Sequence, residues 1–383
     1  MEEIRDFLKK RDEEGSLRIL RPSLSRGAGR IKIGSKEYFD LSSNDYLGIS
    51  DHSALKSASI KAIEQYGTGS SASRLLSGDS ALYHELEEKV ARFKGKPSAL
   101  VFNSGYQGNV GILSALCNDH DAIFADKLSH ASILDGIFLS EAKLFRFKHN
   151  DLEHLESLLR ENRKDYKNCL IITETIFSMD GDRAPLRELV GLKNKYDCSL
   201  MVDEAHATGI FGKNGAGIVE EEGLSEDVDL IMGTFSKALG SFGAYLAGSK
   251  DLIDYLVNTC RSFIYSTALP PAVIAANIAA LDIVEKEPWR RENLLKLSDY
   301  FRTGLKDAGF NPLGSSQIVP VVLGDNFKVL DSSRKLSEKG WWVLAVRPPT
   351  VAKGQSRLRF SLSASHDEKI LGNLLNDIRS LGI

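Results

Sequence analysis

Cysteine is scarce in this sequence, with four residues in a chain of 383. They lie far apart, and no two of them form a C-x-x-C pair; they are Cys117, Cys169, Cys198 and Cys260. A disulfide framework or a cysteine-based zinc site is therefore not expected, and we predict no metal site. This usage is typical of a reducing compartment, so we expect a cytoplasmic protein.

Long apolar runs and excess positive charge are also missing. No stretch approaches the roughly 18 consecutive apolar residues that a membrane-spanning helix needs. The first residues are charged and lack the apolar segment of a signal peptide, so we expect none. Lysine and arginine number 49 against 52 acidic residues, a formal charge of −3. We therefore expect no general attraction to nucleic acid or to an acidic membrane surface.

The composition that is present is that of an ordinary globular protein, with 42% hydrophobic and 26% charged residues. A chain of this length is expected to form two or three packed units. We expect an N-terminal helix and connector over 1–48, a large domain over 49–280 and a small C-terminal domain over 281–383. The helix is predicted at 2–14, with Ile4, Phe7 and Leu8 on one face.

Short apolar runs alternate with longer helical patterns through the middle of the chain. This alternation predicts an α/β fold with a mainly parallel central sheet flanked by helices. Such sheets bind ligands beyond the carboxyl ends of their strands. A smaller α+β domain is expected to follow. The predicted strands are 99–102, 122–125, 169–173, 199–202, 230–233 and 244–247, then 318–323, 342–346 and 358–362.

Polar and glycine residues follow the first of these runs and open a helical pattern. Ser104 can cap that helix, which leaves the amides of Gly105 and Tyr106 facing a bound anion. Taken alone, the segment is better explained as an ordinary capped strand-to-helix turn.

A carboxylate follows another buried run. Asp203 stands at the strand end and His206 comes three residues later. A buried ionised carboxylate needs a partner, and a protonated pyridine nitrogen would serve. Asp203 as a helix cap, with His206 as a bystander, explains the same residues.

Lys237 lies just past a further strand end, among small and apolar residues. Most lysines are solvated surface charges. A desolvated lysine has a lowered pKa and can form a Schiff base. Thr234 and Ser236 beside it carry hydroxyls suited to phosphate.

An anion cradle, a buried carboxylate and a lysine on successive strand ends are what pyridoxal 5′-phosphate (PLP) requires. The combination predicts PLP held as a Schiff base on Lys237. Ser178 is presented by a tight turn after another strand, and His130 could stack on the ring. On spacing alone, His130 is better explained as a core or surface histidine.

The sequence also contains a motif typical of another class of protein. Asp203-Glu204-Ala205-His206 spells a helicase DEAH box, but no G-x-x-x-x-G-K-[ST] phosphate loop occurs in the sequence. A nucleotide-driven motor is therefore excluded. A binding protein without catalysis is compatible with such a fold, but it would not need Lys237 or His130.

The sequence resembles the α-oxoamine synthases, a branch of the fold-type I PLP-dependent enzymes, essentially from end to end. These motifs are highly specific as a set. The matching segments are Leu41–Gly48, Gly67–Gly78, Glu174–Pro185, Thr234–Lys237, Phe263–Pro271 and Arg357–Arg359.

This resemblance implies roles around the cofactor. Lys237 would act as the base and Asp203 would pair with the ring nitrogen. His206 would bond the phenolic oxygen of the ring, with His130 on the ring face and Ser178 helping to hold the cofactor. The phosphate contacts implied are Gly105, Tyr106, Thr234, Ser236 and Thr267.

It also implies an acyltransferase that joins an amino acid to an acyl thioester and releases CO₂. The segment Val346–Val351 resembles the branch that uses L-alanine and a pimeloyl thioester, on coenzyme A or acyl carrier protein. Arg347 would pair bidentately with the amino-acid carboxylate. Arg21 would contact the acyl substrate, and the further substrate contacts implied are Asn44, His130 and Thr350.

A homodimer with active sites at its interface is a further implication, with Ser266 and Thr267 directed to the neighbouring subunit's phosphate. Two residues depart mildly from the family pattern: Ser236, where glycine is common, and Gly108, where alanine is common. Two alternatives stay open. One is another synthase of this family, such as one joining glycine to acetyl-CoA, and the other is a PLP-dependent aminotransferase.

Overall fold

The computed structural model describes residues 2–382. Two compact units are present. The larger unit comprises residues 49–177 and 183–291, and the smaller comprises residues 2–48, 178–182 and 292–382. The three-part division expected from the sequence stays a prediction.

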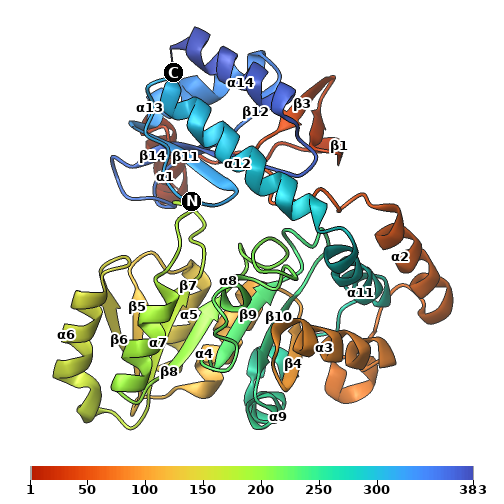
Figure 1. Cartoon of the computed structure of the whole chain (residues 1–383), viewed down its shortest axis with the longest axis vertical. Helices are drawn as coiled ribbons and strands as arrows, with labels where there is room; N and C mark the ends of the chain where they lie inside the picture. The colour runs from red at the N-terminus through yellow and green to blue at the C-terminus, as the bar shows by residue number, and fades with distance from the viewer. Residues whose placement is uncertain (1, 383) are drawn as a thin grey trace. The chain divides into compact units, whose positions relative to one another are not determined.

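The larger unit is built on a seven-stranded sheet in the order β4-β10-β9-β8-β7-β5-β6 (Figure 1). β10 runs antiparallel to both of its neighbours, and the other pairs are parallel. The prediction of a mainly parallel sheet is confirmed. The strands are β4 (Ser98–Phe102), β5 (Ala122–Asp126), β6 (Lys143–Phe147), β7 (Cys169–Glu174), β8 (Ser199–Asp203), β9 (Leu230–Thr234) and β10 (Ala244–Gly248).

The inner strands are uninterrupted apolar runs because both faces of the sheet are covered. Side chains alternate between the faces along a strand. Phe102, Ile172 and Met232 belong to a cluster that includes residues of α4, α5 and α9, and the alternate positions, such as Val202, are equally buried. The helices of this unit are α2 (Ser53–Tyr66), α3 (Ala81–Lys94), α4 (Gly105–Leu116), α5 (Ala131–Ser140), α6 (Leu152–Asn162), α7 (Leu186–Lys195), α8 (Ile218–Glu221), α9 (Lys250–Thr259), α10 (Arg261–Ile264) and α11 (Pro271–Lys286), with a π-helical turn η1 (Arg74–Gly78) and a 3₁₀ turn η2 (Arg163–Asp165).

Four parallel strands end at one edge of the sheet and place polar residues there. Asp126, Glu174, Asp203 and Thr234 are the last residues of β5, β7, β8 and β9. All four are buried. This is the edge at which a doubly wound sheet binds its ligand.

The smaller unit contains two further sheets, in the orders β1-β2-β3-β12 and β11-β14-β13. The connector expected before residue 48 thus contains three strands, and the single strand expected over 342–346 is divided into two. No helix within 2–382 combines the length and apolarity needed to cross a bilayer. The elements are α1 (Glu2–Glu13), β1 (Ser23–Gly27), β2 (Arg30–Ile33), β3 (Lys36–Asp40), β11 (Ile318–Gly324), α13 (Asn326–Glu338), β12 (Trp341–Trp342), β13 (Ala345–Val346), β14 (Ser356–Ser361) and α14 (Glu368–Leu381), and α12 (Trp289–Asp307) spans the boundary between the units.

Candidate active site

The carboxylate of Asp203, at the sheet edge, is held by two hydrogen bonds. Its Oδ2 accepts a hydrogen bond from Asn109 Nδ2 at 3.0 Å, and its Oδ1 accepts one from the Ala205 amide at 2.8 Å. The residue is 6% exposed. Both donors are neutral, so the carboxylate is held in place by donors that do not cancel its charge.

Lys237 and His206 meet beside this carboxylate. Lys237 Nζ lies 2.9 Å from His206 Nε2. Lys237 is half-buried and His206 is buried. The lysine emerges from the turn after β9, and the histidine follows β8, so the two adjacent strands bring them together.

The hydroxyls that flank Lys237 both point to one carbonyl group. Thr234 Oγ1 donates to the Gly243 oxygen at 2.7 Å, and Ser236 Oγ donates to the same oxygen at 3.2 Å. Thr234 Oγ1 also accepts the Ser236 amide. A phosphate contact through either hydroxyl would therefore require that hydroxyl to turn away from Gly243, and both roles stay predictions.

The start of α4 has the form expected of an anion site. Ser104 caps the helix by accepting the Gln107 amide. The first backbone hydrogen bond of the helix runs from the Gly108 amide to the Ser104 carbonyl, so the amides of Gly105 and Tyr106 have no acceptor within the helix. A Cβ on Gly105 would come within 3.0 Å of Met232 Cε. The start of α4 thus packs against a side chain of β9.

His130 caps α5, where its Nδ1 accepts the Ser132 amide at 3.2 Å. A neutral His130 consequently carries its proton on Nε2. Partial desolvation lowers the pKa of His130, and the positive charge of Lys237 lowers it further against the opposing effect of Asp203. An uncharged imidazole is suited to stack on an aromatic ring.

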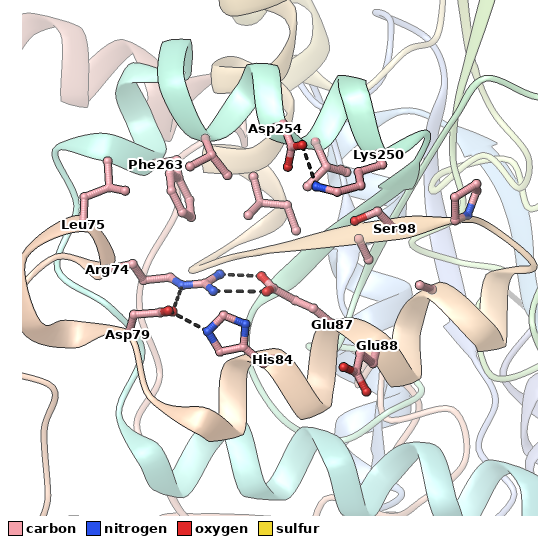
Figure 2. Close-up of a pocket in the computed structure, with 16 residues that line it drawn as sticks. Arg74, Leu75, Asp79, His84, Glu87, Glu88, Ser98, Lys250, Asp254 and Phe263 are labelled. Carbon is pink, nitrogen blue, oxygen red and sulfur yellow. Dashed lines mark hydrogen bonds and ion pairs between the residues drawn. The ribbon is translucent and has the colours of Figure 1, made fainter.

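Thr267 is held near the start of α4 by a network around Arg74. Thr267 forms an antiparallel bridge with Ser73, and its carbonyl oxygen accepts a hydrogen bond from Asn103 Nδ2 at 2.7 Å. Arg74 pairs bidentately with Glu87 and also bonds Asp79 at 2.7 Å (Figure 2).

The motif that contains Arg74 is therefore structural in this unit. Arg74 lines a pocket of about 440 Å³ together with Asp79, His84 and Glu87. Two carboxylates neutralise the guanidinium, and Lys250, which also lines the pocket, is paired with Asp254 at 2.6 Å, so each of these cations already has an acidic partner. The pocket contains none of the site residues expected from the sequence.

Five expected contact residues belong to the smaller unit: Arg21, Asn44, Ser178, Arg347 and Thr350. Their roles stay predictions. Within that unit, Asn44 Oδ1 accepts a hydrogen bond from Arg359 at 3.3 Å, and the Ser178 carbonyl accepts one from Arg359 at 2.6 Å.

Arg18, Arg21 and Arg347 of the smaller unit lie close enough for their positive charges to interact. Thr350 Oγ1 accepts a hydrogen bond from Arg18 at 2.7 Å, and Arg347 donates to the carbonyls of Gly15 and Leu17. Partial burial lowers the pKa of Arg347, and the charges of Arg18 and Arg21 lower it further. No acidic side chain forms an ion pair with these arginines within 2–382, so the cluster is suited to a carboxylate or phosphate ligand.

Sequence reasoning missed the residues that support the site. Asn109 holds Asp203 from α4, and Glu174 stands beside Asp203 in the register of β7 and β8. Lys94 and Glu204 form an ion pair with side chains 1% and 0% exposed. A lone acid ending the apolar run Cys169–Glu174 could have drawn attention to Glu174, whereas nothing in the sequence links Lys94 to Glu204.

The larger unit fits PLP on three observations. Asp203 is buried with neutral donors only, so a cationic ring nitrogen would supply its missing countercharge. Lys237 reaches this edge of the sheet beside His206. The glycine at position 105 opens a helix whose first amides can hold a phosphate.

Comparison with known proteins shows the family. The family model for aminotransferases of class I and II matches residues 36–378. An 8-amino-7-oxononanoate synthase of Geotalea daltonii is 48% identical over 371 residues, covering 96% of this chain and 94% of that protein. One from Geobacter sulfurreducens is 48% identical over 373 residues, covering 97% and 95%.

Solved structures agree with this assignment. A serine palmitoyltransferase from S. paucimobilis, with bound PLP–myriocin, matches with a TM-score of 0.94 at 30% identity, covering 99% of this chain and 96% of that one. An 8-amino-7-oxononanoate synthase from Francisella tularensis matches with a TM-score of 0.79 at 31% identity, covering 90% and 98%. The fold, the PLP cofactor and the enzyme class expected from the sequence are confirmed. The chain belongs to the class I and II aminotransferase family, in which it is a PLP-dependent acyltransferase similar to the 8-amino-7-oxononanoate synthases.

Proposed function

We propose that the protein condenses L-alanine with a pimeloyl thioester and releases CO₂ and free thiol to give 8-amino-7-oxononanoate, a step of biotin synthesis. The observation that carries this proposal is the 48% identity, over 96% of the chain, to a relative named for that product. Arg18, Arg21 and Arg347, which form no ion pair with an acidic side chain within 2–382, support it, because the amino acid and the pimeloyl group both carry carboxylates.

The residues of the larger unit divide the work on the cofactor. Lys237 would hold PLP covalently, and its Nζ would accept the Cα proton of the amino acid. Asp203 would stabilise the protonated ring nitrogen. His206 would bond the ring's phenolic oxygen, and uncharged His130 would stack on the ring. When bound, PLP supplies an electron-accepting ring that stabilises negative charge on the substrate carbon.

The phosphate and the substrates engage the remaining residues. Gly105, Tyr106, Thr234, Ser236 and Thr267 hold the phosphate, with Ser178 also holding the cofactor. In the smaller unit, Arg347 pairs with the alanine carboxylate and Arg21 contacts the acyl substrate. The other substrate contacts proposed are Asn44, His130 and Thr350.

The protein is further proposed to act as a cytoplasmic homodimer. The four cysteines are free, as a reducing compartment requires. Leu75 and Leu76, in the segment that precedes α3, are 51% and 83% exposed and would suit an interface. Sedimentation of the purified chain tests the oligomeric state, and a monomer at micromolar concentration would contradict it.

A matrix of substrates tests the reaction. Alanine, glycine and serine are each combined with pimeloyl-, acetyl- and palmitoyl-CoA, and pimeloyl-acyl carrier protein is assayed with alanine. Release of CO₂ and free thiol is followed together. We expect turnover with alanine and a pimeloyl donor to exceed every other pair. Faster turnover of glycine with acetyl-CoA would select the alternative synthase, and keto-acid formation without CO₂ would indicate an aminotransferase.

A further inference from the structure

Glu174 is a buried acid to which none of the proposed roles has been assigned. It is the last residue of β7 and is 3% exposed. Its carboxyl group accepts the backbone amide of His130, while Oε1 meets no hydrogen-bond donor within 2–382. An ionised carboxylate with an unsolvated oxygen is costly, and a neutral acid in the same place costs less.

The neighbours of Glu174 make ionisation harder still. The sheet register sets Glu174 directly beside Asp203 on β8. Asp126 at the end of β5 adds a second negative charge nearby, and Lys237 after β9 supplies the opposing positive charge. Two adjacent buried carboxyls share their protons unequally, and the one with fewer donors keeps its proton. Asp203 has two neutral donors and Glu174 has one.

We propose that Glu174 is a positioning residue that works as an uncharged carboxylic acid. It fixes the His130 turn by accepting the backbone amide, and it leaves Asp203 as the ionised carboxylate that faces the ring nitrogen. A second negative charge beside Asp203 would favour protonation of Asp203 and weaken its hold on a cationic ring. This role of Glu174 concerns the cofactor site, so it does not depend on which acyl or amino-acid substrate the enzyme uses.

The surroundings of Glu174 support this protonation state. Burial, together with the negative charges of Asp203 and Asp126, raises the pKa of Glu174 to about 8, against the opposing effects of Lys237 and the His130 amide. A folded pKa above the unfolded value of 4.5 gives a contribution to stability that is complete below pH 4.5. That contribution is lost as the pH rises to about 8 and is constant above it.

Full-length wild type and Glu174→Gln are compared by equilibrium unfolding across this pH range, with and without PLP. In the cofactor-free protein we expect the folding constant of the wild type to fall about tenfold per pH unit relative to Glu174→Gln between pH 5 and 8. Glu156→Gln is the matched control. Hydrogen bonds from Lys195 and Tyr196 lower the pKa of Glu156, so its effect is confined to acidic pH.

Infrared difference spectra give a second readout that does not depend on folding or on turnover. The wild type should show a carboxylic-acid carbonyl band that titrates near pH 8 and is missing from Glu174→Gln. A ratio of folding constants that stays flat from pH 5 to 9, or the absence of that band at pH 6, would overturn the proposal. Neither measurement uses an acyl donor, so failure of the proposed condensation leaves this result unaffected.

Discussion

The buried ion pair beneath the active site can be broken from the lysine side by Lys94→Met. Lys94 Nζ donates to Glu204 Oε2 at 2.7 Å, to Thr208 Oγ1 at 3.1 Å and to the Ala216 carbonyl. Burial lowers the pKa of Lys94, but interactions with Glu204 and Tyr245 together outweigh that effect, and the pKa is raised. The lysine is therefore charged, and it cancels the charge of Glu204.

Methionine has a similar length, so the substitution removes charge while leaving only a small cavity. Glu204 would keep one hydrogen bond, from the Val219 amide to Oε1 at 3.0 Å. Removing one partner of a buried pair costs about 3–5 kcal/mol of unfolding free energy, because the other charge is left uncompensated.

Urea unfolding of the cofactor-free protein, followed by tryptophan fluorescence, measures this loss at neutral pH. Lys94→Met with Glu204→Gln should recover most of it, because the pair is then neutral on both sides and the amide still accepts the Val219 N–H. Lys195→Met is the control, since Lys195 pairs with Glu156 on the surface with side chains 62% and 33% exposed, and little change is expected. A loss under about 1 kcal/mol, or a double variant as unstable as the sum of the singles, would refute the argument.

Other substitutions test the remaining assignments. Lys237→Ala should bind PLP only weakly and lose turnover; borohydride reduction and peptide mapping that place the cofactor on another lysine would contradict the assignment. Asp203→Asn should slow exchange of the alanine α-proton about 100-fold or more, and an unchanged rate would remove Asp203 from charge stabilisation. Arg347→Lys should raise the KM for alanine because the bidentate contact is lost, and an unchanged KM would count against that contact. Gly217→Ala should destabilise the fold by about 1–3 kcal/mol, since its φ is +127° and a Cβ would come within 2.2 Å of the Glu204 carboxylate; an unchanged urea midpoint would show that the turn relaxes freely.

The elements predicted correctly are those that the core determines. Six strands of the large sheet coincide with apolar runs in the sequence. Such runs can be recognised because both faces of the sheet are buried, so successive residues of a strand are apolar. β6 was missed because it lies at the sheet edge, where Lys143 and Arg146 are exposed. β1 was missed for a similar reason, since it is mostly exposed and reads as a polar connector.

The functional residues at strand ends could likewise be predicted, but the residues that hydrogen-bond to them or neutralise their charge could not. Asp203, His206 and Lys237 could be proposed together because the rule for parallel sheets places strand ends at one edge. Asn109 contacts Asp203 across 94 positions, and Lys94 contacts Glu204 across 110. Contacts at such separations depend on how helices pack on the sheet, and no local spacing encodes them.

Three acids end neighbouring parallel strands of this sheet, and only their partners distinguish them. Asp126 is bonded to His149 at 3.0 Å and to the amides of Leu128 and Asn150, so it holds loops together. Asp203 accepts hydrogen bonds from two neutral donors, which hold its carboxylate in place but do not cancel its charge. Glu174 has one amide and an unsolvated oxygen, so it retains its proton. Position at the sheet edge makes each acid available for function, and the donors that reach it decide which one carries the charge.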